Sequence, residues 1–331
     1  MENRPYRPHR SLFWPIVLIG VGIIWLLGNL GAIAAFDLPV LFRLWPVLLV
    51  FIGLELLIGR RSPKVGVVLG VLTLVAVVGF LVGGRQLGLS PDVQVKTERF
   101  SAPIGEAASA SVLLAFSDSP ATVSALANST DLIEANLTYI GSINFRVTGT
   151  ARKVVRLARN EADFLLFTPL YWDPSLNWQV GLSPQVPTDL TVDGGSGESQ
   201  LDLSQLKLNS LKASMGSGAS AFTTPAAGPE THIQANGGSG SMDWSIPAGA
   251  AMEMHLSGGS GSVNIRLPGS AVVLLEIRDQ DTGAITFPPG WVPVTSARGV
   301  QATWETPGFA QASRVIHIII DHAGSGSIHI S

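Results

Sequence analysis

The densest group of side chains with a possible chemical role is basic. Five cations stand within fourteen residues, and we call them the basic strip: Arg146, Arg152, Lys153, Arg156 and Arg159. Guanidinium and ammonium groups bind phosphate and carboxylate, and salt weakens such contacts by screening them. The basic strip could therefore bind an anionic cell-wall polymer or lipid headgroups. The alternative is a solvated strand face without a ligand.

Histidines and carboxylates form no catalytic motif. Five of the six histidines follow residue 231, and none has the HExxH spacing or another paired metal spacing. They include His255, His317 and His329, which alternate with apolar residues and are expected on the solvent side of strands. The acids Asp202, Asp243, Glu253 and Glu276 stand singly, without the carboxylate pair that glycoside hydrolysis needs.

Two short polar groups remain, Asp279-Gln280-Asp281 and Asp321-His322. Both are interpreted as turn residues in preference to calcium or catalytic ligands. The absence of cysteine removes disulfides, thiolate metal sites and cysteine nucleophiles. We therefore expect no enzyme activity, no cofactor and no metal site.

Charge is low and unevenly distributed. Charged residues make up 14% of the chain, against about 25% in an ordinary soluble domain. Residues 1–85 carry eight Lys/Arg and three Asp/Glu, a net charge of +5, whereas residues 86–331 carry thirteen and twenty-one, a net charge of −8. An acidic C-terminal part argues against nucleic acid as a partner, because binding to phosphates needs a basic surface.

Three apolar runs at residues 12–34, 42–58 and 65–84 predict a transmembrane region over residues 12–84. Basic residues gather before the first run and between the second and third, which predicts a cytoplasmic tail at residues 1–11. The chain beyond the linker 85–91 is then extracytoplasmic. The alternative is signal-peptidase cleavage at Ala32-Ile33-Ala34, but the preceding apolar run is longer than a typical signal peptide core.

The first two runs repeat each other. Trp14-Pro15 and Gly22 recur, 31 residues later, at Trp45-Pro46 and Gly53. Gly66 and Gly70 add a small-x3-small pattern in the third run. Glycines at such positions permit close helix contact, so we expect Gly22, Gly53, Gly66 and Gly70 to pack helices together.

A second repeat fills the C-terminal part. Ser-Gly or Thr-Gly pairs place glycines at intervals of 21 or 22 residues, with one degenerate coil expected around Trp304–Pro307; the glycines are Gly197, Gly218, Gly240, Gly261, Gly283 and Gly326. Apolar and polar residues alternate between them, which is typical of strands. A unit this short must share its core with neighbouring units. We expect a β-solenoid over residues 191–331 with these glycines at its corners, the alternative being an antiparallel sandwich.

Residues 92–190 lack this period and are expected to form an irregular β subdomain. The predicted fold class is thus membrane-anchored all-β: a three-helix transmembrane region, an irregular β subdomain and a β-solenoid.

Two segments resemble known bacterial families. LFWPIVLIGVGIIWLLGNLG and LWPVLLVFIGLELLIGRR, within residues 11–61, resemble the LiaI/LiaF-like transmembrane region of envelope proteins. NWQVGLSPQVPTDLTVDGGSGESQLDLSQLKLNSLKASMGSGAS, from Asn177 to Ser220, resembles the toast-rack, adhesin-like domain. The resemblance implies a multi-pass protein of the bacterial cell membrane that senses or tunes envelope stress.

The expected partners are membrane lipid, a sensor kinase or another membrane protein, and an anionic cell-wall polymer. The alternative function is a surface adhesin or structural envelope-binding module that the helices tether.

Overall fold

The computed structural model describes residues 95–160, 176–226 and 231–331 continuously, and isolated helical residues between positions 15 and 75. The chain divides into two compact units, residues 1–93 with 164–172 and residues 94–163 with 173–331. Each unit is described by itself.

The first unit is described only at short helical pieces, which include residues 18–20, 49–50 and 71–73. No helix within this described part is both long enough and apolar enough to cross a membrane. The three predicted spans lie largely outside the described residues, as do Gly66 and Gly70. A Cβ placed on Gly22 or Gly53 would meet no described atom within 4 Å.

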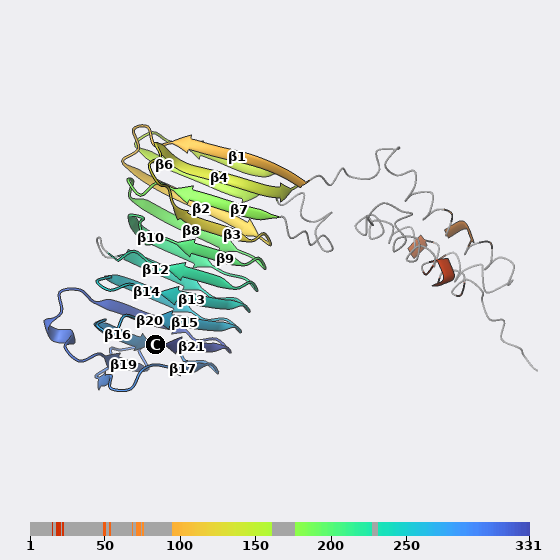
Figure 1. The fold of residues 1–331 in the computed structure, drawn as a ribbon. Helices are drawn as coiled ribbons and strands as arrows, with labels where there is room; N and C mark the ends of the chain where they lie inside the picture. The colour runs from red at the N-terminus through yellow and green to blue at the C-terminus, as the bar shows by residue number, and fades with distance from the viewer. Residues whose placement is uncertain are drawn as a thin grey trace, which may run out of the picture. The chain divides into compact units, whose positions relative to one another are not determined.

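In its described residues, the second unit consists of two long sheets and one short 3₁₀ helix, η2 (Phe309–Gln311) (Figure 1). Sheet A contains ten strands in the order β1-β4-β7-β3-β9-β11-β13-β15-β21-β17. Sheet B contains eleven strands in the order β18-β19-β16-β20-β14-β12-β10-β8-β2-β6-β5. The strands are β1 (Val95–Pro103), β2 (Ser109–Ser117), β3 (Ala121–Ala125), β4 (Asp131–Ile140), β5 (Ile143–Thr148), β6 (Arg152–Arg159), β7 (Asn177–Leu182), β8 (Thr188–Gly194), β9 (Ser199–Asp202), β10 (Leu208–Ser214), β11 (Ser220–Thr223), β12 (Thr231–Asn236), β13 (Ser241–Ser245), β14 (Met252–Ser257), β15 (Ser262–Arg266), β16 (Val273–Ile277), β17 (Ala284–Thr286), β18 (Val292–Val294), β19 (Ala302–Glu305), β20 (Ile316–His322) and β21 (Ser327–Ile330).

Each coil of the chain gives one strand to sheet B and the next to sheet A. From β8 to β15 the coils follow one another, and equivalent strands pair in parallel, with a single register shift between Leu208 and Ser210 in the pairing of β8 with β10. Leu190, Leu211, Ile233 and Met254 are thus aligned on four neighbouring strands, all with side chains buried between the sheets. The alternation of apolar and polar residues along each strand produces this shared core, because side chains of a strand point alternately to its two faces.

The corner glycines lie against one another along one edge of the stack. A Cβ on Gly218 would lie 2.0 Å from the carbonyl oxygen of Gly197, and one on Gly240 would lie 2.0 Å from that of Gly218. The same approach, 1.8 Å, relates Gly261 to Gly240 and Gly326 to Gly261. Neighbouring backbones therefore approach too closely at these corners for any side chain, which explains the recurrence of glycine.

The spatial order of the coils differs from their sequence order at the C-terminal end. The coil of β20 and β21 lies between that of β14 and β15 and that of β16 and β17. The prediction of a degenerate coil around Trp304–Pro307 is therefore wrong. The chain there forms β18 and β19, which add antiparallel pairs beside β16 and do not form a parallel coil of the stack. Strand β20 is more apolar than β19, the strand expected in this place. Its residues Ile316, Ile318, Ile319 and Ile320 are all buried, which suits an interior strand with a parallel neighbour on each side.

The N-terminal end repeats this arrangement. Strands β2 and β3 lie between the coil of β6 and β7 and the coil of β8 and β9, with parallel pairing on both sides. Strands β1, β4 and β5 add antiparallel pairs at the end. The irregular subdomain expected over residues 92–190 is therefore not separate, because its strands belong to the same two sheets and its core is continuous with the rest.

Aromatic residues fill the core and close one end. Trp244 stacks on Phe222 with ring centroids 4.2 Å apart, and both side chains are fully buried. At the C-terminal end Phe287 contacts Trp291 and Trp304, at centroid distances of 5.3 and 5.1 Å. These rings cover the last coil, which has no further coil to bury its apolar face.

Candidate functional site

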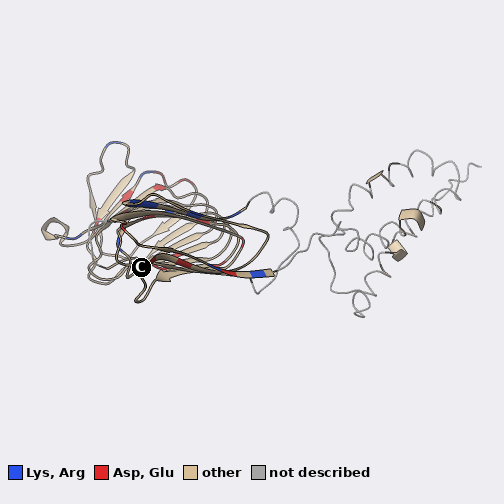
Figure 2. Cartoon of the chain, turned by 90° about the horizontal axis from the view of Figure 1, so that it is seen from above, with Lys and Arg blue, Asp and Glu red and all other residues tan. Residues whose placement is uncertain are grey.

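The basic strip lies on two neighbouring strands at the N-terminal end of sheet B. Arg146 is on β5, and the other four cations are on β6. Figure 2 views this end of the stack, with Lys and Arg drawn in blue. Because side chains alternate along a strand, the five cations do not all face the same way.

Three of the five cations are engaged by other parts of the fold. Arg152 forms an ion pair with Asp189 at 3.1 Å, and the Lys153 ammonium donates to the carbonyl oxygen of Pro103 at 2.6 Å. Arg159 is only 8% exposed and forms an ion pair with Asp118 at 2.8 Å. Arg152 reaches across β2 to β8, Lys153 reaches the end of β1, and Arg159 reaches the loop after β2, so these three side chains hold the fold together.

The other two cations of the strip face solvent side by side. Arg146 and Arg156 are directly opposite each other on the antiparallel strands β5 and β6, and both are exposed. Neither has an ion pair or hydrogen bond within the described part of the chain. Like charges at opposite positions destabilise a sheet by up to about 1 kcal/mol, so folding gives no reason for this pair.

A groove begins beside this pair on the outer face of sheet B. Its volume is about 760 Å³, and it crosses strands β6, β2, β8 and β10. In register across these strands lie Arg156, Leu113, Thr191 and Lys212. In this row Leu113 and Thr191 on the middle strands are shorter than the two cations on the outer strands, and this difference hollows the face. We call this feature the sheet B groove.

The groove combines cations with groups that hydrogen-bond to hydroxyls. Arg156 and Lys212 stand on its opposite sides, separated by three strand spacings, or about 14 Å between backbones. Asp193 on β8 lines it between these sides, Ser214 lies beside Lys212 on β10, and Asn144 and Asn160 line its end near β5. Such a lining suits a ligand that carries both negative charge and hydroxyl groups.

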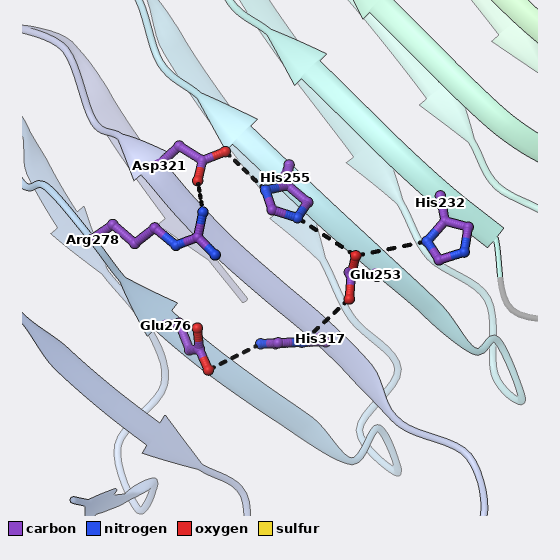
Figure 3. Close-up of polar contacts among 7 residues, drawn as sticks. All are labelled: His232, Glu253, His255, Glu276, Arg278, His317 and Asp321. Carbon is purple, nitrogen blue, oxygen red and sulfur yellow. Dashed lines mark hydrogen bonds and ion pairs between the residues drawn. The ribbon is translucent and has the colours of Figure 1, made fainter. Parts of the chain in front are cut away.

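A second polar cluster lies on the same sheet toward the C-terminus (Figure 3). We call it the histidine ladder: His232, Glu253, His255, Glu276, Arg278, His317 and Asp321. Glu253 is its centre, with carboxylate oxygens 3.7 Å from His232, 3.5 Å from His255 and 3.9 Å from His317.

The ladder joins the inserted strand β20 to both neighbours. Asp321 contacts His255 on β14 at 2.9 Å and Arg278, just after β16, at 2.7 Å. His317 contacts Glu253 on β14 and, at 3.4 Å, Glu276 on β16. The His317 imidazole thus lies between the carboxylates of Glu253 and Glu276.

One group among the described residues has potential metal ligands within 4.8 Å of one another: Asp279, Asp281 and His322. The two aspartates and the histidine are largely exposed, and the Asp279 carboxylate also accepts the backbone N–H of Asp281. Asp281 accepts the N–H of Gly324 at 3.0 Å. The Asp279–Asp281 bond is that of a turn, the role expected for Asp279-Gln280-Asp281, whereas the Asp281–Gly324 bond joins neighbouring coils. The turn expected at Asp321-His322 is wrong, because both residues lie at the end of strand β20.

Two titratable groups with shifted pKa values lie on β4 of sheet A. Hydrogen bonding from Ser129, with the charge of Arg99, lowers the pKa of Glu134. Burial, with the neighbouring carboxylate of Glu98, raises the pKa of Tyr139 to about 12. Neither group belongs to the groove or the histidine ladder.

The sequence identified the basic strip but not the groove or the ladder. Lys212 and Thr191 are 21 residues apart, as are Glu253 and His232, so the repeat period contained a signal for both contacts. The contacts of His317 and Asp321 had no such signal, because they depend on the insertion of β20.

Comparison with known proteins identifies two families along the chain. The LiaF transmembrane domain matches residues 13–91, and the N-terminal domain of toast_rack, DUF2154, matches residues 91–244. No curated protein matches the chain. One similar solved structure is that of a candidate cell adhesion protein from Clostridium sporogenes; it is 18% identical, covers 72% of this chain and 99% of its own, and has a TM-score of 0.47.

The matches confirm the arrangement suggested by the sequence, a LiaF-like transmembrane region followed by a toast-rack domain. The first match associates the chain with a membrane. All residues of the sheet B groove lie within the second match.

Proposed function

We propose that this protein binds anionic envelope material on the outer side of a bacterial membrane and thereby modulates the response to envelope stress. In this proposal three helices anchor the protein, the N-terminus is cytoplasmic and residues 92–331 are extracytoplasmic. Binding and signalling need no catalysis, and the protein acts without a cofactor. A membrane partner such as a sensor kinase contacts the hairpin within residues 12–61.

One observation carries the binding part of this proposal: the exposed pair Arg146 and Arg156, with Lys212 across the groove. The second unit is acidic in composition, yet these three cations share one face, and none of them forms an ion pair with a described residue. A solvated strand face does not require like charges at directly opposite positions, whereas binding of an anionic polymer offsets their repulsion.

The matched families support the anchoring part. A LiaF transmembrane domain at residues 13–91 agrees with the apolar runs, and the toast-rack domain follows directly.

Retention on isolated cell envelopes tests the proposal. We expect the full-length protein, in a non-ionic detergent, to be retained at low salt and released at high salt, since screening weakens contacts between exposed charges. The double variant Arg146→Gln/Arg156→Gln should be released at lower salt than Arg298→Gln, which removes an exposed cation from the loop between β18 and β19. Equal retention of all three proteins at every salt concentration would contradict the proposal.

Crosslinking in cells tests the signalling part. A sensor kinase recovered through residues 12–61 supports regulation. Envelope binding by the protein without any such membrane partner would instead support an adhesive or structural module.

A further inference from the structure

We infer that the sheet B groove binds a phosphate-bearing polyol or sugar unit. The inference rests on the proposed function and names the ligand that the same face takes.

The shape of the face argues for a chain-like ligand that lies in the groove. Leu113 and Ala115 on β2 and Thr191 on β8 form a floor of short side chains, and longer cations stand on β6 and β10. A hollow of about 760 Å³ is within the range of small-molecule sites. A flat membrane surface would contact the ends of Arg156 and Lys212 but would leave the floor empty.

The charges argue for phosphate. Arginine presents a planar fork of donors that matches phosphate oxygens, and lysine binds phosphate as a point charge. Arg156 and Lys212 lie on opposite sides of the groove, so a ligand with anionic groups at intervals can reach both.

The remaining lining argues for hydroxyl groups between the anionic groups. Asp193 is an acceptor inside a site that otherwise attracts anions, and a purely anionic ligand would be repelled by it. A hydroxyl donor satisfies this carboxylate, and Thr191 and Ser214 offer further hydroxyl partners. Leu113 supplies an apolar surface against which the C–H groups of a polyol or sugar can pack.

Labelled poly(glycerol phosphate) is the probe, with full-length protein in non-ionic detergent and fluorescence anisotropy as the readout. Two variants fill the groove without changing its charge: Thr191→Trp and Ala115→Leu. Both side chains face out of the sheet, so the core is retained, and thermal unfolding verifies this. We expect each variant to weaken binding about tenfold or more, a change of about 1.4 kcal/mol. Arg298→Gln, remote from the groove, should leave the affinity unchanged.

Asp193→Leu tests hydroxyl recognition, because it removes the hydrogen-bond acceptor together with the charge, whereas an amide would keep an acceptor oxygen. It should weaken binding of poly(glycerol phosphate) while leaving unchanged, or strengthening, the binding of inorganic polyphosphate, which lacks hydroxyls. Stronger binding of both polymers by this variant would mean that Asp193 acts only as a repulsive charge and would overturn the inference.

The other outcomes distinguish this inference from the proposed function. If wild-type protein binds the probe and both filled variants bind it equally well, the groove is not the site, although anionic binding stands. If the wild type prefers phosphatidylglycerol vesicles and the groove variants have no effect, a lipid surface replaces the groove ligand. If the wild type binds neither probe nor vesicles, both proposals fail.

Discussion

Single residues at the corners set how closely the coils stack. Gly240 lies in the middle of the stack, and its backbone N–H donates to Gly216 of the preceding coil at 3.2 Å. The carbonyl oxygen of Gly218 occupies the space where a Cβ would be. A backbone atom cannot move aside as a side chain can, so the coil itself must shift.

The variant Gly240→Ala should therefore destabilise the protein by about 1–3 kcal/mol, the usual cost of overpacking. Denaturant unfolding of the full-length protein measures the change. Gly269→Ala is the matched control, because a Cβ there would meet no atom within 4 Å and should change stability by a few tenths of a kcal/mol. Equal effects of the two variants would mean that the corners are not tightly stacked.

Tyr139, on β4 near the N-terminal end of the stack, has a shifted pKa that makes stability depend on pH. Its pKa is raised to about 12, mainly by burial and also by the Glu98 carboxylate. A folded pKa above the unfolded value of about 10 means that the neutral phenol stabilises the fold below pH 10. That contribution is lost as the pH rises from about 10 to about 12.

Tyrosinate absorbance against pH checks this value. One of the three tyrosines should titrate near pH 12, and Tyr139→Phe should remove that step. A step that persists in the variant would assign the shifted group elsewhere.

Among the elements, the coil of β20 and β21 joins the coils on either side of it in the C-terminal half, because both of its strands have a parallel neighbour on each side. It lies between two coils that precede it in sequence, and the histidine ladder crosses it on the outer face. In a stack built in sequence order, loss of the last coil would remove a single interface. Here its loss leaves β14, β15, β16 and β17 without their parallel neighbour on one side.

Truncation after Ala312 should therefore disorder β16 and β17 as well as the deleted residues. Hydrogen exchange of the protein that ends at Ala312 should show lost protection over Val273–Ile277 and Ala284–Thr286, whereas β8 to β11 remain protected as in the full-length protein. Retained protection of β16 would show that its coil stacks directly on that of β14.

The sequence predicted the periodic elements well and the inserted ones poorly. Alternation and a period of 21 or 22 residues identify the strands and the corner glycines, because both patterns are local. They do not identify which coil lies next to which, since pairing of β20 with β14 joins residues more than 60 positions apart. The same limit explains the expected separate subdomain over residues 92–190, whose strands β2 and β3 were inserted between later coils.

The candidate site was predictable to a similar extent. The spacing of cations in the sequence showed the basic strip, but the strand register decides which of them have an ionic partner. Arg152 forms an ion pair with Asp189 on β8, whereas Arg146 lies opposite Arg156 and has none among the described residues. Lys212 and the small residues of the floor lie beside the basic strip only because β6, β2, β8 and β10 are neighbours in sheet B, and this strand order cannot be read from the sequence.

At the scale of the whole molecule, the proposal requires residues 12–84 to lie in the membrane region and residues 92–331 to lie outside the cell. The chain contains no cysteine, so single cysteines report on topology without background. Ala297→Cys, in an exposed loop of the second unit, should react with a membrane-impermeant maleimide added to intact cells. Ser62→Cys, between the second and third apolar runs, should react only after the membrane is opened. Labelling of Ser62→Cys in intact cells would contradict the proposed orientation.

The central claim is that two cations of the basic strip bind an anionic polymer while the others hold the fold. The most direct measurement compares the dissociation constants for poly(glycerol phosphate) of two double variants with the same change of charge, Arg146→Gln/Arg156→Gln and Arg152→Gln/Lys153→Gln. The account predicts that the first pair loses about tenfold or more in affinity and is at least as stable as the wild type, because the repulsion between Arg146 and Arg156 is removed, whereas the second binds nearly as wild type and unfolds more easily. Equal losses of affinity would mean that total charge alone governs binding, and would contradict it.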